Sequence, residues 1–214
     1  MNLTIKALTR DLEKEYFDFF DNRAFSDGSP YYPCYCNAFN MSKEQISIEL
    51  LGKAESYGGG IDGWKKALRE SAVQMVRSGE IQGYLAFENG LAVGWCNAND
   101  RMNYYRVGEF DLGNVPEDEE PTACQKKGQI KSIVCFEIAP EYRNRGIATK
   151  LLERVCFDAE KEGYDFMEAY PTAQEQYNVL AFTGTIHFYE KAGFTPFVHK
   201  ENMVIMRKML RDTA

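Results

Sequence analysis

The sequence predicts a mixed α/β fold, a twisted sheet flanked by helices, and three observations support it. An apolar, β-branched run from Ile133 to Ile138, bounded by Pro140, is typical of a buried strand. A short basic turn then leads into apolar residues at helical spacing from Ile147 to Ala159. Earlier in the chain, Asn89-Gly90 lies between two apolar runs, which is the strongest short signal for a β-hairpin.

Length and composition indicate one globular domain, residues 1–214. A chain of 214 residues with 44% hydrophobic residues can bury a sizeable core. The sequence contains no apolar stretch long enough for a membrane span and starts without the pattern of a signal peptide. We therefore expect a cytoplasmic protein whose six cysteines are thiols. The net charge of −7 argues against nonspecific nucleic-acid binding.

The N-terminal part is expected to be largely helical. A first strand over residues 3–8 precedes a helix for which Thr9 is the candidate N-cap. Residues 25–40 are typical of a loop and contain the aromatic segment Tyr31–Phe39. Residues 43–57 and 61–77 predict two further helices, separated by three glycines.

The C-terminal part is expected to return to the sheet. The predicted hairpin spans residues 84–96, and residues 164–170 predict a strand that ends at a proline. A helix over residues 184–191 and two closing strands over residues 194–198 and 203–209 follow.

The basic turn from Arg143 to Ala148 has the chemistry of a pyrophosphate cradle. The unpaired N–H groups at the start of a helix, together with the helix dipole, attract anions. Gly146 lets the backbone approach a phosphate closely, and Arg143 and Arg145 can grip phosphate oxygens. On chemistry alone, an ordinary strand–turn–helix unit with two solvated arginines remains an equal alternative.

Two motifs in this order resemble the GNAT superfamily of N-acetyltransferases. The first is Arg143-Asn144-Arg145-Gly146-Ile147-Ala148 after Pro140-Glu141-Tyr142, and the second is Phe188-Tyr189-Glu190-Lys191-Ala192-Gly193-Phe194. The resemblance firmly covers residues 131–210. It implies a mostly antiparallel twisted sheet with a splayed central pair of parallel strands. Residues 1–130 would then form the acceptor side and residues 131–210 the acetyl-CoA-binding core.

The resemblance also implies which residues hold acetyl-CoA, the expected co-substrate, with no metal involved. The extended pantetheine arm would pair with the backbone of one strand. Pyrophosphate would occupy the cradle. The implied residues are Cys135, Phe136 and Ile138 on the strand and Arg143, Asn144, Arg145, Gly146, Ile147, Ala148 and Thr149 in the cradle. The chain departs from the family where an asparagine often contacts the cofactor, since Phe182-Thr183-Gly184-Thr185 stands there.

The implied chemistry is direct attack of an amine on the thioester in a ternary complex. Tyr189 stands where the family places the acid that protonates the departing thiolate, although a packed core aromatic is the alternative. Glu137 and Glu168 are candidate bases on neighbouring strands. The N–H of Phe136 is the candidate donor to the developing oxyanion. Cys135 is better interpreted as a core thiol than as a nucleophile.

The acceptor is less defined by the sequence. The aromatic loop and the acidic run Pro116–Pro121 favour a small cationic amine, although such charge runs usually face water. The segment with Cys34 and Cys36, similar to that of some bacterial family members, carries too few nearby ligands for a metal site. The alternatives are a catalytically silent acyl-CoA sensor and a transferase for a longer acyl group. A homodimer is left open.

Overall fold

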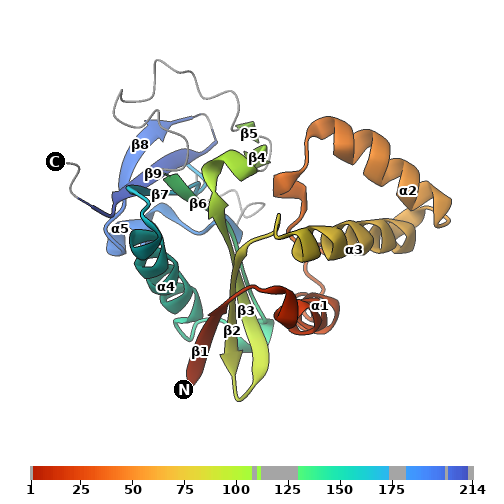
Figure 1. Cartoon of the computed structure of the whole chain (residues 1–214), viewed down its shortest axis with the longest axis horizontal. Coiled ribbons are helices and arrows are strands. Elements are labelled where there is room, and N and C mark those ends of the chain that lie inside the picture. Colours follow the sequence, from red (N-terminus) through yellow and green to blue (C-terminus); the bar gives the residue numbers. More distant parts are fainter. Residues whose placement is uncertain (1, 108–109, 112–129, 174–181, 201, 212–214) are drawn as a thin grey trace.

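The computed structural model describes residues 2–107, 110–111, 130–173, 182–200 and 202–211. Most of the described helices lie in the N-terminal part of the chain, and two more follow the basic turn (Figure 1). The α-helices are α1 (Glu13–Asn22), α2 (Leu51–Ser56), α3 (Gly60–Ser78), α4 (Ile147–Glu162) and α5 (Ile186–Lys191). Short 3₁₀ turns lie at Arg10–Leu12, Ala38–Asn40, Arg101–Asn103 and Pro140–Tyr142, and a π-helix at Gln45–Leu50.

A seven-stranded sheet in the order β1-β2-β3-β6-β7-β9-β8 forms the centre. Among the described strands of this sheet, β6 and β7 run parallel and every other neighbouring pair is antiparallel. The strands are β1 (Leu3–Ala7), β2 (Gly83–Glu88), β3 (Leu91–Asp100), β6 (Ile130–Ile138), β7 (Phe166–Ala169), β8 (Thr195–His199) and β9 (Val204–Met209). A separate short pair joins β4 (Arg106–Val107) to β5 (Phe110–Asp111). The predicted fold class is confirmed: a mostly antiparallel sheet with one central parallel pair, flanked by helices.

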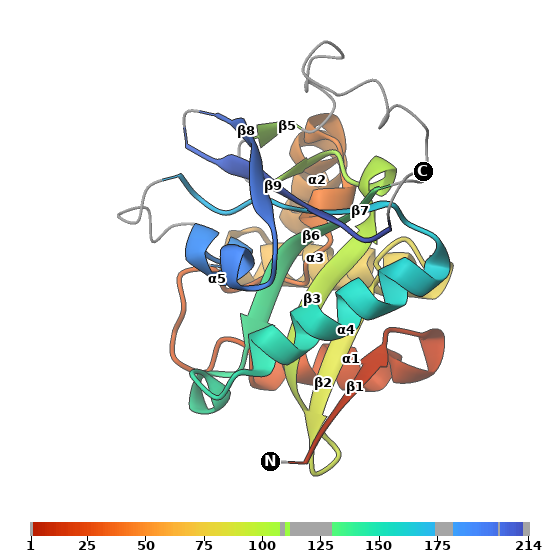
Figure 2. The same cartoon turned by 90° about the vertical axis from the view of Figure 1, so that its left-hand side faces the viewer.

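Helices cover both faces of the sheet. In Figures 1 and 2, α4 lies on one face, while α1 and α3 lie on the other. Each face has its own hydrophobic core. The α4 side packs Leu151, Val155 and Phe194, and the α1 side packs Tyr16, Phe20 and Trp95. Since both faces of the central strands are buried, β3 and β6 are apolar along most of their length.

The expected elements are present, with two local differences. Thr9 makes no side-chain cap, because a 3₁₀ turn follows it and α1 begins only at Glu13. The predicted helix over residues 43–57 opens with a π-helix before α2. Its start carries a reciprocal capping pair: Ser42 N–H donates to Gln45 Oε1 (2.8 Å), and Gln45 N–H donates to Ser42 Oγ (3.1 Å).

The parallel pair separates halfway along β6. The paired residues run from Ile130 opposite Phe166 to Ile133 opposite Ala169, where β7 ends. β6 continues to Ile138 with β3 on its other side. Within the described part of the chain, this leaves one edge of β6 without a neighbouring strand beyond Ile133. Among the described helices, none is long and apolar enough to cross a membrane.

Candidate active site

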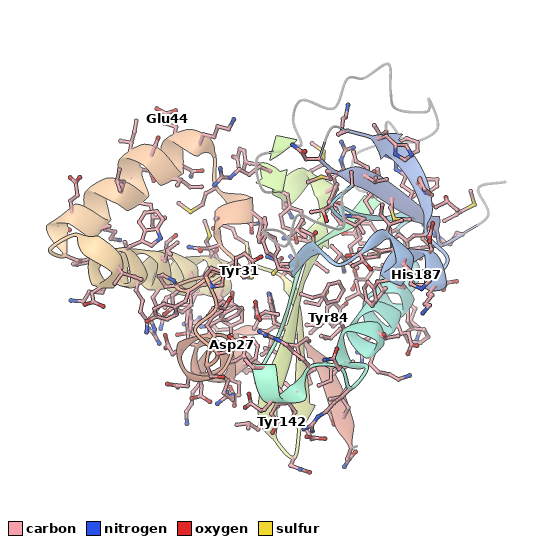
Figure 3. All side chains as sticks on the ribbon, turned by 180° about the vertical axis from the view of Figure 1, so that it is seen from behind. Asp27, Tyr31, Glu44, Tyr84, Tyr142 and His187 are labelled. Carbon is pink, nitrogen blue, oxygen red and sulfur yellow. The ribbon has the colours of Figure 1, made fainter. Side chains whose placement is uncertain are left out.

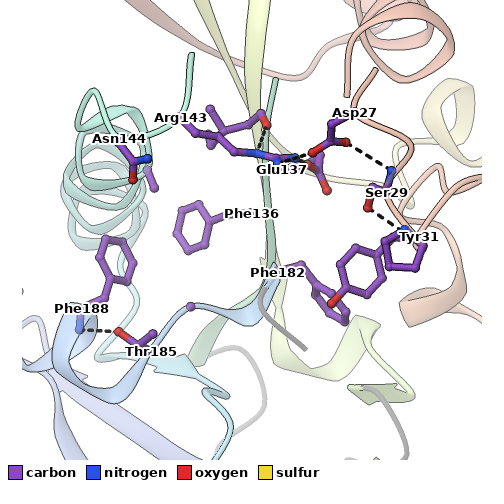
Figure 4. A pocket seen from close by; sticks show the side chains of 14 residues that line it. Asp27, Ser29, Tyr31, Phe136, Glu137, Arg143, Asn144, Phe182, Thr185 and Phe188 are labelled. Carbon is purple, nitrogen blue, oxygen red and sulfur yellow. Dashed lines mark hydrogen bonds and ion pairs between the residues drawn. The ribbon is translucent and has the colours of Figure 1, made fainter. Parts of the chain in front are cut away.

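A pocket of about 720 Å³ opens where β6 and β7 separate. It reaches from α4 and α5 on one side to the loop after α1 on the other, and Figure 4 shows both walls. Its lining residues are Asp27, Ser29, Pro30, Tyr31, Phe136, Glu137, Ile138, Arg143, Asn144, Ala148, Phe182, Gly184, Thr185 and Phe188. One cavity thus joins the predicted cofactor strand and cradle to the N-terminal part of the chain.

The edge of β6 that has no strand partner among the described residues borders this pocket. The Ala139 N–H donates to Val93 O on β3 (3.0 Å). Because N–H groups alternate sides along an extended strand, the N–H groups of Ile138 and Phe136 face away from β3, toward the open edge. The same alternation turns the N–H of Cys135 toward β3. Phe136 and Ile138 are therefore the stronger candidates of the three predicted strand residues.

The Cys135 side chain lies on the face of β6 that packs against the loop containing Cys36. Its Sγ is 3.6 Å from Cys36 Sγ, and both thiols are buried. Although the contact with Cys36 opposes the shift, burial raises the pKa of Cys135 to about 11. A neutral buried thiol is a weak nucleophile, which agrees with its interpretation as a core residue. No group of three or more potential metal ligands is found among the described residues.

The cradle forms an open helix start. Asn144 (φ 61°) and Gly146 (φ 76°) both adopt left-handed backbone conformations, which turn the chain into α4. Lys150 N–H makes the bond to Gly146 O (3.1 Å), so the N–H groups of Ile147, Ala148 and Thr149 precede the helical ladder. No side chain caps this terminus and its first turn carries no acidic residue. The first turn is therefore free to accept an anion.

The predicted cradle residues differ in where their side chains lie. Asn144 and Ala148 line the pocket, whereas the Ile147 side chain is buried in the core and only its backbone faces the turn. Arg145 stacks on Tyr142 and lies 3.9 Å from a carboxylate oxygen of Glu88. Thr149 is exposed to solvent and is not among the residues that line the pocket.

Arg143 points toward the side of the pocket formed by the loop after α1. Its guanidinium donates to Ile138 O (3.0 Å), Asp27 Oδ2 (2.5 Å) and, more loosely, Glu137 Oε1 (3.4 Å). Figure 4 shows these side chains next to one another in the pocket. Asp27 comes from the loop after α1 and was not singled out in the sequence. Only the folded chain brings it to the cradle, 116 positions away.

Glu137 is the more deeply buried of the two carboxylates that line the pocket, the other being Asp27. It is 8% exposed. Burial raises the pKa of Glu137 to about 7, against the attraction of Arg143, which lowers it. A carboxylate with this pKa can accept a proton near neutral pH.

Glu168, the other predicted base, lies outside the pocket lining. It is 1% exposed, accepts a hydrogen bond from Arg207 Nε (2.6 Å) and another from the Tyr170 hydroxyl (2.8 Å). Arg101 adds a third polar contact at 3.5 Å. This network ties β7 to β9 and occupies the carboxylate, so Glu137 is the better-placed base.

Tyr189 is placed in the core and not in the pocket lining. Its side chain is fully buried, and its hydroxyl donates to Thr183 O (2.8 Å). Burial raises the pKa of this phenol well above its usual value. The neighbouring Phe188 lines the pocket instead and packs edge-on against Phe136 at 5.5 Å. Thr185 Oγ1 caps α5 by accepting from Phe188 N–H (3.1 Å).

The predicted aromatic loop divides between pocket and core. Tyr31 lines the pocket and packs edge-on against Phe182 at 5.3 Å, whereas Tyr35 is buried and donates to Asp21. Figure 3 shows Asp27 and Tyr31 on the side of the N-terminal helices that faces β6. Cys36 is buried against β6. Asn97 on β3 donates to Cys36 O (3.0 Å) and so ties this loop to the sheet.

Several predicted features fall outside the described residues. They include the acidic run of residues 116–121.

Comparison with known proteins identifies the family. Residues 80–196 match the model of the acetyltransferase (GNAT) domain, more than half of the chain. The chain therefore belongs to the GNAT acetyltransferase family. No match was found among curated proteins.

Solved structures share the fold at low sequence identity. PaiA N-acetyltransferase from Thermoplasma acidophilum, solved with coenzyme A, is 16% identical with a TM-score of 0.52, covering 98% of this chain and 99% of that one. YncA from Salmonella typhimurium, solved with its cofactor acetyl-CoA, is 14% identical with a TM-score of 0.50, covering 100% and 97%. These similarities show that the fold is shared.

Proposed function

We propose that this protein transfers an acetyl group from acetyl-CoA to a primary amine by direct attack in a ternary complex. One observation carries the proposal. A single pocket contains an open strand edge, an uncapped helix start and a buried carboxylate whose pKa is about 7. The first two features suit pantetheine and pyrophosphate, and the third suits an amine that must lose a proton.

The described residues fit the co-substrate. A Cβ placed on Gly146 would have no neighbour within 4 Å, so the space above the cradle is open. Phe136 and Phe188 form an apolar wall next to it, suited to the pantetheine arm and the acyl group. Bound acetyl-CoA supplies an activated thioester, and two relatives of this fold were solved with coenzyme A or acetyl-CoA.

The protein's own residues would divide the remaining work. Glu137 takes a proton from the substrate ammonium, directly or through water, and the neutral amine that results attacks the thioester. The N–H of Phe136 on the open edge of β6 donates to the oxygen that gains negative charge. Tyr189 is retained as the candidate acid. Its hydroxyl must leave Thr183 O to reach the pocket.

The engaged hydroxyl of Tyr189 also keeps the second candidate function open, a silent acyl-CoA sensor. Thermal unfolding with acetyl-CoA, free CoA and ATP tests the binding part of both. At about 100 times its dissociation constant a ligand adds roughly 2.7 kcal/mol, a rise of about 5–11 °C in a domain of this size. Shifts with both CoA compounds and none with ATP are expected.

Release of free thiol in the presence of an amine panel separates the two functions. The transferase reading requires thiol release that depends on the amine and a product that carries the acetyl group. Binding of acetyl-CoA without release for any amine would favour the sensor. Absence of binding would contradict both.

A further inference from the structure

Arg143 opens the cradle motif, yet its described polar contacts lie on β6 and on the loop after α1. The Nε donates to Ile138 O (3.0 Å), one terminal nitrogen lies 2.5 Å from Asp27, and the other lies 3.4 Å from Glu137. The guanidinium is therefore shared between two carboxylates, with the closer contact to Asp27 (Figure 4).

This asymmetry matters for Glu137. A carboxylate that receives both arms of a guanidinium is strongly stabilised in its charged form and becomes a poor proton acceptor. Here Asp27 takes the closer arm, so Glu137 is only loosely paired although it lies beside a cation. Asp27 also adds a second negative charge near Glu137.

We propose that Asp27 is a positioning residue that draws the guanidinium of Arg143 away from Glu137 and so keeps Glu137 able to accept a proton. The inference rests on the proposed function in that it concerns the same base. It assigns to the loop after α1 a role in the chemistry of β6.

The geometry holds Arg143 near Glu137 even without Asp27. The Arg143 Nε remains bonded to Ile138 O on the strand that carries Glu137. Removal of the Asp27 charge would therefore free a guanidinium arm that is already within reach of Glu137. Asp27 itself is steadied by the Ser29 N–H, which donates to its other oxygen (3.3 Å).

The charges around Glu137 support this interpretation. Burial raises the pKa of Glu137 to about 7, Arg143 opposes that shift, and Asp27 adds to it. Although burial opposes it, the Arg143 contact lowers the pKa of Asp27, which keeps that carboxylate ionised. The thiols of Cys34, Cys36 and Cys135 also lie near Glu137, and because their pKa values are all raised they stay neutral. The phenol of Tyr31 lines the same pocket.

The test is a direct titration of the Glu137 carboxyl by carbon NMR on protein labelled at glutamate, with Glu137→Gln identifying the signal. In Asp27→Asn the Glu137 pKa is expected to fall by about one unit or more, the size of effect that a nearby charge exerts. Asp27→Glu keeps the charge and is expected to restore most of the wild-type value.

Asp18→Asn is the matched control. Asp18 also pairs with an arginine, Arg23 at 2.7 Å, but lies outside the pocket lining. It is expected to leave the Glu137 signal unchanged. An unchanged or raised Glu137 pKa in Asp27→Asn, in a protein whose amide spectrum shows it folded, would overturn the inference.

The pH dependence of kcat/KM gives a second readout. The acidic limb of the Asp27→Asn profile is expected to move to lower pH, whereas a purely structural role would lower the rate at every pH without a shift. If no amine is acetylated, the proposed function fails, but the NMR titration still decides the role of Asp27.

Discussion

Glu137→Gln tests the electrostatics of the site without any substrate. Glu137 is nearly buried, and its pKa rises from an ordinary value of 4.5 to about 7 in the folded protein. A carboxyl with a raised folded pKa stabilises the protein below its unfolded pKa. That contribution is lost as pH rises through the folded pKa. The wild type therefore loses stability between about pH 4.5 and pH 7 because of this group.

The magnitude follows from the shift. About 2.5 pKa units at 1.36 kcal/mol each correspond to roughly 3 kcal/mol, an order-of-magnitude value for a buried group. Glutamine does not ionise, so Glu137→Gln is expected to gain about 2.5 kcal/mol relative to the wild type when the comparison moves from pH 5 to pH 8, since part of the loss already occurs below pH 5. Urea unfolding at both pH values measures this difference.

The control is Glu153→Gln, because Glu153 lies on the exposed surface of α4. This variant should show no comparable change between the two pH values. If the relative stability of Glu137→Gln is the same at pH 5 and pH 8, Glu137 titrates normally and the argument for a base near neutrality fails. Turnover should fall by about 10²–10⁴ in the same variant.

Three further outcomes are expected. Gly146→Glu should abolish stabilisation by acetyl-CoA in calorimetry, because the new side chain brings bulk and negative charge into the cradle. Gly79→Glu, at another left-handed glycine (φ 80°) outside the pocket lining, should keep binding. Tyr189→Phe should spare binding but lower turnover. It should also cost about 0.5–1.5 kcal/mol by removing the hydrogen bond from the Tyr189 hydroxyl to Thr183 O. Full turnover in that variant would remove Tyr189 as the acid. Glu168→Ala should cost about 3–5 kcal/mol in urea unfolding, since it breaks a buried ion pair with Arg207 by removing the carboxylate. A loss below 1 kcal/mol would show that the network contributes little.

Local patterns in the sequence were enough to predict the framework. The β-branched run, the basic turn and the helical spacing each specify a conformation over a few residues, and β6, the cradle and α4 follow them. The hairpin of β2 and β3 follows from Asn89-Gly90 for the same reason. The predicted N-cap of α1 was wrong, because a 3₁₀ turn follows Thr9 and the helix starts after it.

The direction of individual side chains was decided by tertiary packing and not by local sequence patterns. Phe188 and Tyr189 are adjacent in one motif, but packing of α5 places the first in the pocket and the second in the core. Glu137 and Glu168 look equivalent in the sequence. Only the folded sheet brings Arg207 and Tyr170 to Glu168 and leaves Glu137 beside the pocket.

The sequence by itself determined the family, the fold class and the position of the cradle, because these depend on short-range periodicity and on motif residues close together in the chain. The tertiary structure alone decided that Asp27 meets Arg143 and that Arg143 lies beside Glu137. The contact between Asp27 and Arg143 joins segments 116 positions apart. Its strength depends on burial and on competing charges, which no local pattern encodes.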